Sequence, residues 1–258
     1  FLDSRWYKIA AIAGDTTIIL QEGYGGSSLS GATYRASSAA RDCEFTELTI
    51  KGSTSALGAI DGDDCRNILL EDITFVQNNV NLTMTNFSEF NSIRTVSAAA
   101  TGNGAEFTTG PFCINQNFAN DGNGGHGFVL NGVVDGVFFY CASSGNTSDG
   151  FNITNCTNID ILAKANSNGG QGFECVSGNS RIKFYEPEAV ANTSDGIKLT
   201  ASSDYCKVIG GHYAFNGGYG VNIAASTCDK NIISCATFDT NTSGNYNDSG
   251  TNTVLVGV

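Results

Sequence analysis

A short phrase of polar, small and apolar residues recurs through the second half of the chain. Each copy has an Asn, two small residues, a polar residue, a Gly and then an apolar residue. The clear copies begin at Asn123, Asn146, Asn168, Asn192 and Asn216, and a degenerate copy begins at Asn241. Successive Asn residues are 22 to 25 positions apart, a period that is typical of stacked supersecondary units.

The three residues after each Gly follow an alternating pattern, in which the middle residue is Val, Asn, Glu or Lys. The alternating segments are 128–130, 151–153, 173–175, 197–199 and 221–223, and in each the first and third residues are apolar. This period of two predicts short strands with one buried face. A second strand is predicted a few residues later, at 137–139, 159–161, 182–184, 208–209 and 232–233. No stretch shows a sustained helical period.

A unit of about 23 residues with two or three strands and no helix cannot close a core of its own. We therefore predict that each strand pairs in parallel with its copies in the neighbouring units. This gives an all-β parallel β-helix, and the handedness of parallel crossovers favours the right-handed form. We expect about nine coils of 22–25 residues over residues 43–258. The register is least defined between residues 80 and 123. Residues 1–42 are predicted to be a small β cap at the end of a larger upstream region.

Stacking the coils turns each repeated position into a column. The Asn positions are expected to form a hydrogen-bonded ladder at a tight turn, because an Asn amide can bond to its neighbours and Asn tolerates the left-handed conformation. The repeated Gly is expected to adopt a positive φ. The apolar residue after it is expected to stack on its copies in the core, as in the column Phe151, Phe173, Ile197 and Val221.

Composition fits a folded, turn-rich β protein, with 32 Gly, 2 Pro and 41% hydrophobic residues. The formal net charge of −12 disfavours binding to nucleic acid or to anionic membranes, and no apolar run approaches the length of a membrane span. We therefore expect neither a nucleic-acid partner nor membrane insertion. Most of the 9 Cys fall at repeat positions and are expected to be buried thiols, although Cys206 and Cys228 on adjacent coils would be within reach of a disulfide.

Two segments carry a resemblance to known proteins. The residues from Trp6 to Leu20, and from Tyr24 to Arg35, resemble the β-module that precedes β-helices in phage tail spikes and related virion or surface appendages. The repeat behind them resembles the pectate-lyase-like superfamily. This resemblance implies an extracellular location on a virion or cell surface, a homotrimer, and a lateral face that binds a polysaccharide or a cell-surface glycan. A structural and recognition role is therefore our first expectation.

Three fragments resemble motifs of the polygalacturonases. They are Asp61-Gly-Asp-Asp64, Gly125-His-Gly127 and Arg181-Ile-Lys183. The family places its motifs on neighbouring coils, whereas here they are more than two coils apart, and the Asn-Thr-Asp element is missing upstream. A polysaccharide-degrading hydrolase or lyase remains an alternative, as does a purely structural filament or surface-layer subunit. The sequence leaves enzymatic activity open and favours a role without it.

The residue before the repeated Gly is where chemistry or recognition on this edge would be encoded. His126 and Asp149 should lie one coil apart within hydrogen-bond reach, with Glu106 on the other side, which makes these three the candidate catalytic residues. Gln171, Asp195 and Tyr219 continue the column and are candidate glycan-binding residues. The simpler interpretation of the column is a row of solvated turn residues.

An acidic turn provides candidate calcium ligands, because carboxylate oxygens are the ligands that Ca²⁺ prefers. These are Asp61, Asp63 and Asp64. The simpler interpretation is an ordinary polar turn, and no other cofactor is expected.

Overall fold

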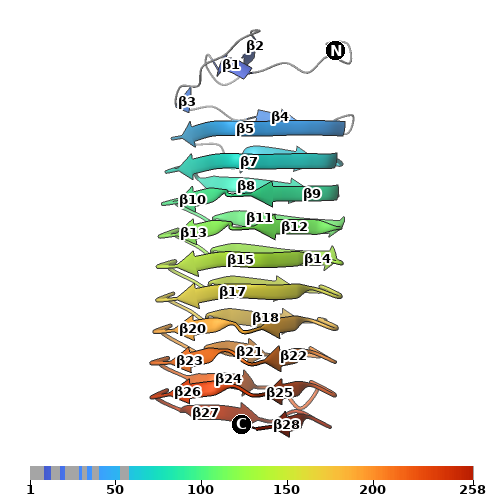
Figure 1. The fold of residues 1–258 in the computed structure, drawn as a ribbon, viewed down its shortest axis with the longest axis vertical. Coiled ribbons are helices and arrows are strands. Elements are labelled where there is room, and N and C mark those ends of the chain that lie inside the picture. The colour runs from blue at the N-terminus through green and yellow to red at the C-terminus, as the bar shows by residue number, and fades with distance from the viewer. Residues whose placement is uncertain are drawn as a thin grey trace.

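The protein is a rod of stacked β coils (Figure 1). The computed structural model describes residues 44–52 and 59–257 in full, and gives the backbone of residues 9–12, 18–20, 29–30, 34–36, 41–43 and 58. The fold is the predicted all-β, right-handed parallel β-helix, with about nine turns. In this part of the chain we find no helix that is long and apolar enough to cross a membrane.

One lateral wall of the rod, here called face 1, is a ten-stranded parallel sheet with one strand from each coil. Its strands are β4 (Tyr34–Ala36), β6 (Gly58–Asp63), β8 (Val80–Thr85), β11 (Ala105–Pro111), β14 (Phe128–Val134), β16 (Phe151–Thr154), β18 (Phe173–Ser177), β21 (Ile197–Leu199), β24 (Tyr219–Ile223) and β27 (Gly244–Asp248).

A sixteen-stranded parallel sheet forms the remaining walls. Its strands are β3 (Leu29–Ser30), β5 (Arg41–Lys51), β7 (Arg66–Val76), β9 (Ser88–Ile93), β10 (Val96–Ala98), β12 (Cys113–Gln116), β13 (Ala119–Asp121), β15 (Val137–Ser144), β17 (Asp160–Asn166), β19 (Lys183–Tyr185), β20 (Glu188–Val190), β22 (Lys207–Ile209), β23 (His212–Ala214), β25 (Ile232–Ser234), β26 (Thr237–Asp239) and β28 (Val254–Val256).

Left-handed residues such as Asp72, Arg94, Asn117 and Tyr140, with φ between 50° and 55°, bend this sheet along its length. The bend divides it into two walls. Face 2 comprises β9, β12, β19, β22, β25, β28 and the first halves of β5, β7, β15 and β17. Face 3 comprises β3, β10, β13, β20, β23, β26 and the second halves of the same long strands.

Most of the predicted cap lies outside the described residues. Within it, β1 (Ile9–Ile12) pairs with β2 (Ile18–Leu20) in antiparallel fashion, whereas β3 pairs with β5 and β4 with β6 in parallel. Parallel pairing of the solenoid type therefore extends upstream into the region that the sequence assigned to the cap, and the cap as a separate unit stays a prediction.

The predicted Asn ladder is confirmed. From Asn123 to Asn216, each side-chain Nδ2 donates to the Oδ1 of the Asn on the next coil, at 2.8 to 3.0 Å, and Asn241 is the last acceptor. The same Oδ1 atoms also accept the backbone N–H of the preceding Asn, at 3.0 to 3.2 Å. Upstream, Ala100 occupies a rung, and its backbone N–H still donates to Asn123 Oδ1.

The backbone at this turn differs from the expectation in two ways. The left-handed residue is the one before the Asn, for example Gly145 (φ 62°), Ser167 (φ 56°) or Phe215 (φ 56°), and not the Asn itself. The repeated Gly does not have a positive φ either. A Cβ on Gly150 would lie 2.6 Å from the Gly172 carbonyl oxygen, so Gly is required here because consecutive coils approach closely.

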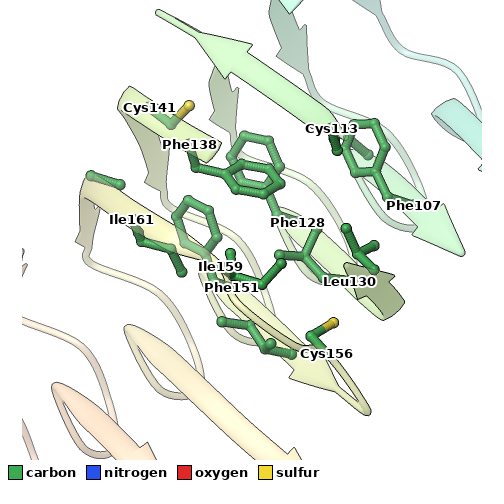
Figure 2. Packing of buried hydrophobic residues seen from close by; sticks show 14 of the residues in the cluster. Phe107, Cys113, Phe128, Leu130, Phe138, Cys141, Phe151, Cys156, Ile159 and Ile161 are labelled. Atoms are coloured by element: carbon green, nitrogen blue, oxygen red, sulfur yellow. The ribbon is translucent and has the colours of Figure 1, made fainter. Parts of the chain in front are cut away.

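The interior is filled by columns of like side chains, as predicted. Phe128 stacks on Phe151 with ring centroids 4.5 Å apart, and Phe151 stacks on Phe173 at 5.0 Å (Figure 2). The cysteines that the structure describes are all free, and apart from Cys235 all are buried. Burial raises the pKa of the Cys156 thiol to about 11, so this thiol is neutral at physiological pH.

Candidate functional site on face 1

Two rows of polar side chains run along the outside of face 1. The strand register sets the outward residues of β11 to β24 side by side in the order Glu106, Val129, Asn152, Glu174, Lys198 and Asn222. The second row contains the residues before the repeated Gly, namely His126, Asp149, Gln171, Asp195 and Tyr219. The first row is exposed because side chains alternate between the two sides of each strand. The second row is aligned because the same turn precedes each strand.

The second row has a structural role that the sequence did not indicate. The backbone N–H of Gln171 donates to Asp149 Oδ1 at 2.8 Å, and that of Tyr219 donates to Asp195 Oδ1 at 2.7 Å. The N–H of His126 likewise donates to Asn103 Oδ1 at 2.7 Å. Side chains in this row thus accept hydrogen bonds from backbone N–H groups of the next coil. The turn therefore requires a side chain with an acceptor atom at these positions.

The structure brings His126 and Asp149 together. His126 Nδ1 accepts the backbone N–H of Asp149 at 3.2 Å and lies 3.2 Å from Asp149 Oδ2. With the imidazole proton on Nε2, the first contact is a hydrogen bond, whereas protonation of Nδ1 makes the second an ion pair. The His126 side chain is 29% exposed and that of Asp149 only 7%. The arrangement is one in which a buried carboxylate orients an accessible imidazole.

Asp149 is held as a carboxylate. Burial opposes its ionisation, but hydrogen bonds from His126, Asn152 and the Gln171 backbone outweigh that effect, so the pKa of Asp149 lies below its ordinary value of 3.8. A carboxyl group that stays ionised near neutral pH is unsuited to act as a general acid. Asp149 is therefore suited to position His126 and to balance its charge.

Further polar groups extend the His126–Asp149 pair across the next two coils. Asn152 Nδ2 donates to Asp149 Oδ2 at 3.0 Å and to Glu174 Oε2 at 3.5 Å, so both carboxylates contact one amide nitrogen. Lys198 Nζ lies 3.1 Å from Glu174 Oε1. We call His126, Asp149, Asn152, Glu174 and Lys198 the face-1 cluster. It places two carboxylates, an imidazole and an ammonium within one continuous network.

The other residues predicted for this face lie around the cluster. Glu106 accepts a hydrogen bond from Asn103 Nδ2 at 2.8 Å, so Asn103 links Glu106 to His126. The side-chain amide of Gln171 lies between Asp149 and Lys198, and its orientation is the one that donates to the first and accepts from the second. Asp195 is 7% exposed and accepts from Asn222 Nδ2 at 2.8 Å, while Tyr219 is half-buried on the next coil.

The acidic turn lies towards the N-terminal end of face 1. Asp61 is buried and Asp63 and Asp64 are exposed, and Asp63 Oδ1 accepts from Asn86 Nδ2 at 3.2 Å. Among the described residues, no three His, Cys, Asp or Glu side chains are grouped so as to hold a metal ion. The hypothesis of a calcium site at these three residues therefore gains no support from the structure.

Sequence reasoning missed Asn152, Glu174 and Lys198. Each is the middle residue of an alternating strand, where it was taken only as a marker of the solvent side. Spacing gave only a partial signal. Asp149 and Asn152 are three residues apart across the repeated Gly, whereas the similar contact between Asp195 and Asn222 joins two consecutive coils and is not visible as a local spacing.

Comparison with solved structures finds right-handed parallel β-helix proteins of similar fold. No family model and no curated protein matches the sequence. The A-module of the mannuronan C-5 epimerase AlgE6 from Azotobacter vinelandii has a TM-score of 0.61 at 15% identity, over 91% of this chain and 86% of that one. The AlgE4 A-module from the same organism gives 0.57 at 14%, over 89% and 86%. The catalytic domain of a GH87 α-1,3-glucanase, in complex with tetrasaccharides, gives 0.53 at 11%, over 90% and 58%. At these identities the similarity establishes the fold alone.

Proposed function

We propose that the protein binds a polysaccharide along face 1 and cleaves it by acid–base chemistry at the face-1 cluster. The observation that carries the proposal is the His126–Asp149–Asn152–Glu174–Lys198 network, which joins four consecutive coils on one lateral wall. A linear polymer lying along the rod would contact several coils at once. The solved structures of similar fold include a mannuronan C-5 epimerase module and an α-1,3-glucanase catalytic domain in complex with tetrasaccharides, which supports a polysaccharide as the ligand.

In this proposal each residue of the cluster has a distinct role. His126 transfers a proton through Nε2, which has no hydrogen-bond partner among the described residues, while Asp149 fixes the orientation of its ring. Glu174, held beside Asp149 by the Asn152 amide, takes a proton from an attacking water, and His126 gives its proton to the departing glycosidic oxygen, so that water adds across the bond that breaks. Lys198 stabilises negative charge that develops on the sugar oxygen or on Glu174.

The charges on face 1 favour a neutral glycan over a polyanion. Between β11 and β24 the carboxylates are Glu106, Asp149, Glu174 and Asp195, and the lysine Lys198 is already paired with Glu174. This part of the face therefore offers no unpaired cation to a sugar carboxylate. Carboxylates and amides instead suit the hydroxyl groups of a neutral sugar, and Tyr219 offers a ring for stacking.

The test is to incubate the chain with neutral and anionic polysaccharides and to measure new reducing ends. We expect cleavage of a neutral polymer, and we expect His126→Ala to lower the rate by roughly 10²-fold or more, the contribution typical of a general acid or base. Glu188→Gln on face 3 is the matched control. Glu188 pairs with Lys164 at 2.8 Å and with Asn166 at 2.6 Å, and the Lys164 hydrogen bond likewise lowers its pKa, but it has no imidazole beside it. Equal loss in both variants would contradict the proposed site.

A second candidate function is glycan recognition without cleavage, as in a surface appendage. The observation that favours it is the capping of backbone N–H groups by Asp149 and Asp195, which accounts for these residues without catalysis. Binding without any product, weakened by Tyr219→Ala, would select this function. A location on a virion or cell surface belongs to this second candidate and stays a prediction.

A further inference from the structure

Face 2 is apolar on its outer side as well as on its inner side. Two outward columns follow its strand register along the rod, one from Leu69 to Val254 and one from Glu71 to Val256. Most of their members are large and apolar, and all are half-buried or exposed. They are Leu69, Ile93, Ile114, Val137, Phe139, Leu162, Tyr185, Ile209, Ile232, Val254 and Val256.

The contrast with face 1 shows that this pattern is not a general property of the solenoid. On face 1 the half-buried or exposed residues of β8 to β24 are mostly polar, and the large apolar exceptions are Val80, Pro111, Val129, Val134 and Val176. Parallel strands that carry many apolar side chains on both sides are normally covered on both sides, and an extensive exposed apolar surface marks an interaction site even where polar residues such as Asn91 and Lys207 interrupt it. The outer side of face 2 therefore has the composition of a buried surface.

Aromatic residues at the margins of face 2 are held in costly positions. Tyr140 is 71% exposed and Phe112 is 54% exposed, and both are left-handed, with φ of 55° and 54°. A bulky residue in this conformation lowers the stability of the folded state by about 1–2 kcal/mol, and an exposed ring does not offset this cost by burial within the chain. Contact with a partner would supply the burial that these rings lack, since aromatic residues are enriched at interfaces.

The charge distribution indicates what covers face 2. With β5 included, its outward positions carry three acids, Glu44, Glu71 and Asp160, and two bases, Lys183 and Lys207. Asp160 and Lys183 pair with each other at 3.0 Å, and Glu71 is neutralised by Arg94. The chain as a whole carries a formal charge of −12. Face 2 is therefore the wall on which two copies can meet without opposing their acidic surfaces.

The size of face 2 is sufficient for a specific contact. Eight steps between coils at about 4.8 Å give a length of roughly 40 Å, and a strand of four residues gives a width of about 13 Å. Two such faces in contact would cover about 1,000 Å², the size at which specific interfaces begin. The partner must be equally long, straight and apolar, and the same face of a second copy meets that description.

We propose that the protein self-associates side by side, with the face-2 strands of each copy turned towards a shared symmetry axis. Like faces then cover each other, as in other symmetric assemblies, and the polar cluster of face 1 remains on the outside. The proposal does not depend on any activity at face 1.

Size-exclusion chromatography with light scattering tests the proposal. We expect the full chain to have a mass of two or more copies, and Phe139→Asp and Ile209→Asp each to give the mass of one copy. Val190→Asp is the control, because Val190 is half-buried and outward on face 3. Circular dichroism identifies any variant that does not fold. A monomeric full chain would overturn the proposal, as would variants that keep the assembled mass, or a control that dissociates equally.

Hydrogen exchange of the unaltered chain gives a readout that needs no variant. On dilution, we expect faster exchange confined to β12, β15, β17, β19 and β22, with the face-1 strands unchanged. Exchange that is independent of concentration, or that changes equally on all three faces, would overturn the proposal.

Discussion

The Asn ladder and the column of residues before the repeated Gly both accept backbone N–H groups, but from opposite directions along the rod. In the Asn ladder, the backbone N–H of one coil donates to a side chain of the following coil, as from Asn146 to Asn168. In the column before the Gly, the backbone N–H donates to a side chain of the preceding coil, as from Gln171 to Asp149. The ladder is buried and uses both the oxygen and the nitrogen of each amide, so it requires Asn. The outer column uses a single acceptor atom, so Asn, His and Asp can all occupy it.

The largest effect is expected from a change in the ladder. Asn168→Ala removes hydrogen bonds to the backbone and side chain of Asn146, to the Ser143 carbonyl and to Asn192. Because buried polar groups are left without partners, we expect a loss of about 3 kcal/mol or more, measured by denaturant unfolding. Asn131→Ala, at an exposed position of β14, is the control. Equal stability of the two variants would contradict the distinction between ladder and surface Asn.

A smaller loss is expected where coils approach closely. In Gly150→Ala the new Cβ would lie 2.6 Å from the Gly172 oxygen and 2.9 Å from Asn168 Nδ2, so we expect a loss of about 1–3 kcal/mol. Gly122→Asn is the control, because Gly122 has a φ of 61° and open space around its Cβ position. The melting temperatures compare the two. A larger loss at Gly122 would show that φ, and not crowding, determines where Gly is needed.

The contribution of Asp149, in the column before the repeated Gly, should make the free energy of unfolding depend on pH. The pKa of Asp149 is depressed in the folded state, so its contribution to stability is present above the unfolded value, near 3.8, and is lost as pH falls through the folded value. Asp149→Asn should cost about 1–2 kcal/mol at neutral pH and lose less stability than the original chain in acid. Unfolding curves recorded from neutral pH to below pH 3.8 measure this. Parallel pH profiles for both proteins would refute the assignment.

The smallest effect is expected at Gln171. Its side chain accepts no backbone N–H from the next coil, and its amide contacts only the side chains of Asp149 and Lys198. Gln171→Ala should change the free energy of unfolding by no more than about 0.5 kcal/mol. A loss as large as that of Asp149→Asn would mean that the whole column, and not only its acceptors, supports the turn.

The fold could be predicted from the sequence because its determinants repeat. From Asn123 to Asn216 each copy repeats the Asn of the ladder and an apolar residue at the position of Phe151, so the period alone identified the ladder and the core column. The reason for the Gly was predicted wrongly, because crowding at Gly150 arises from a carbonyl on the next coil, which no local pattern contains. The sequence shows that the repeat unit recurs, but it does not show which atoms of neighbouring coils come into contact.

The face-1 cluster and face 2 could be predicted less well, for a related reason. Glu174 and Lys198 occur once each, and only the parallel register sets them side by side. The outward residues of face 2, such as Ile114 and Phe139, differ from coil to coil, so no recurring residue type in the sequence identifies them as a column. The register between residues 80 and 123 was also undefined, because Ala100 replaces Asn on one rung.

The direction of the hydrogen bonds between coils determines how the rod carries mechanical load. The strands run across the long axis of the rod (Figure 1), so the hydrogen bonds that pair strands of neighbouring coils run along it. Tension between the two ends would pass through each junction between coils in series, so the weakest junction yields first and the rod unwinds coil by coil. A sideways load would instead be shared by many strands at once, so the rod resists shear better than traction.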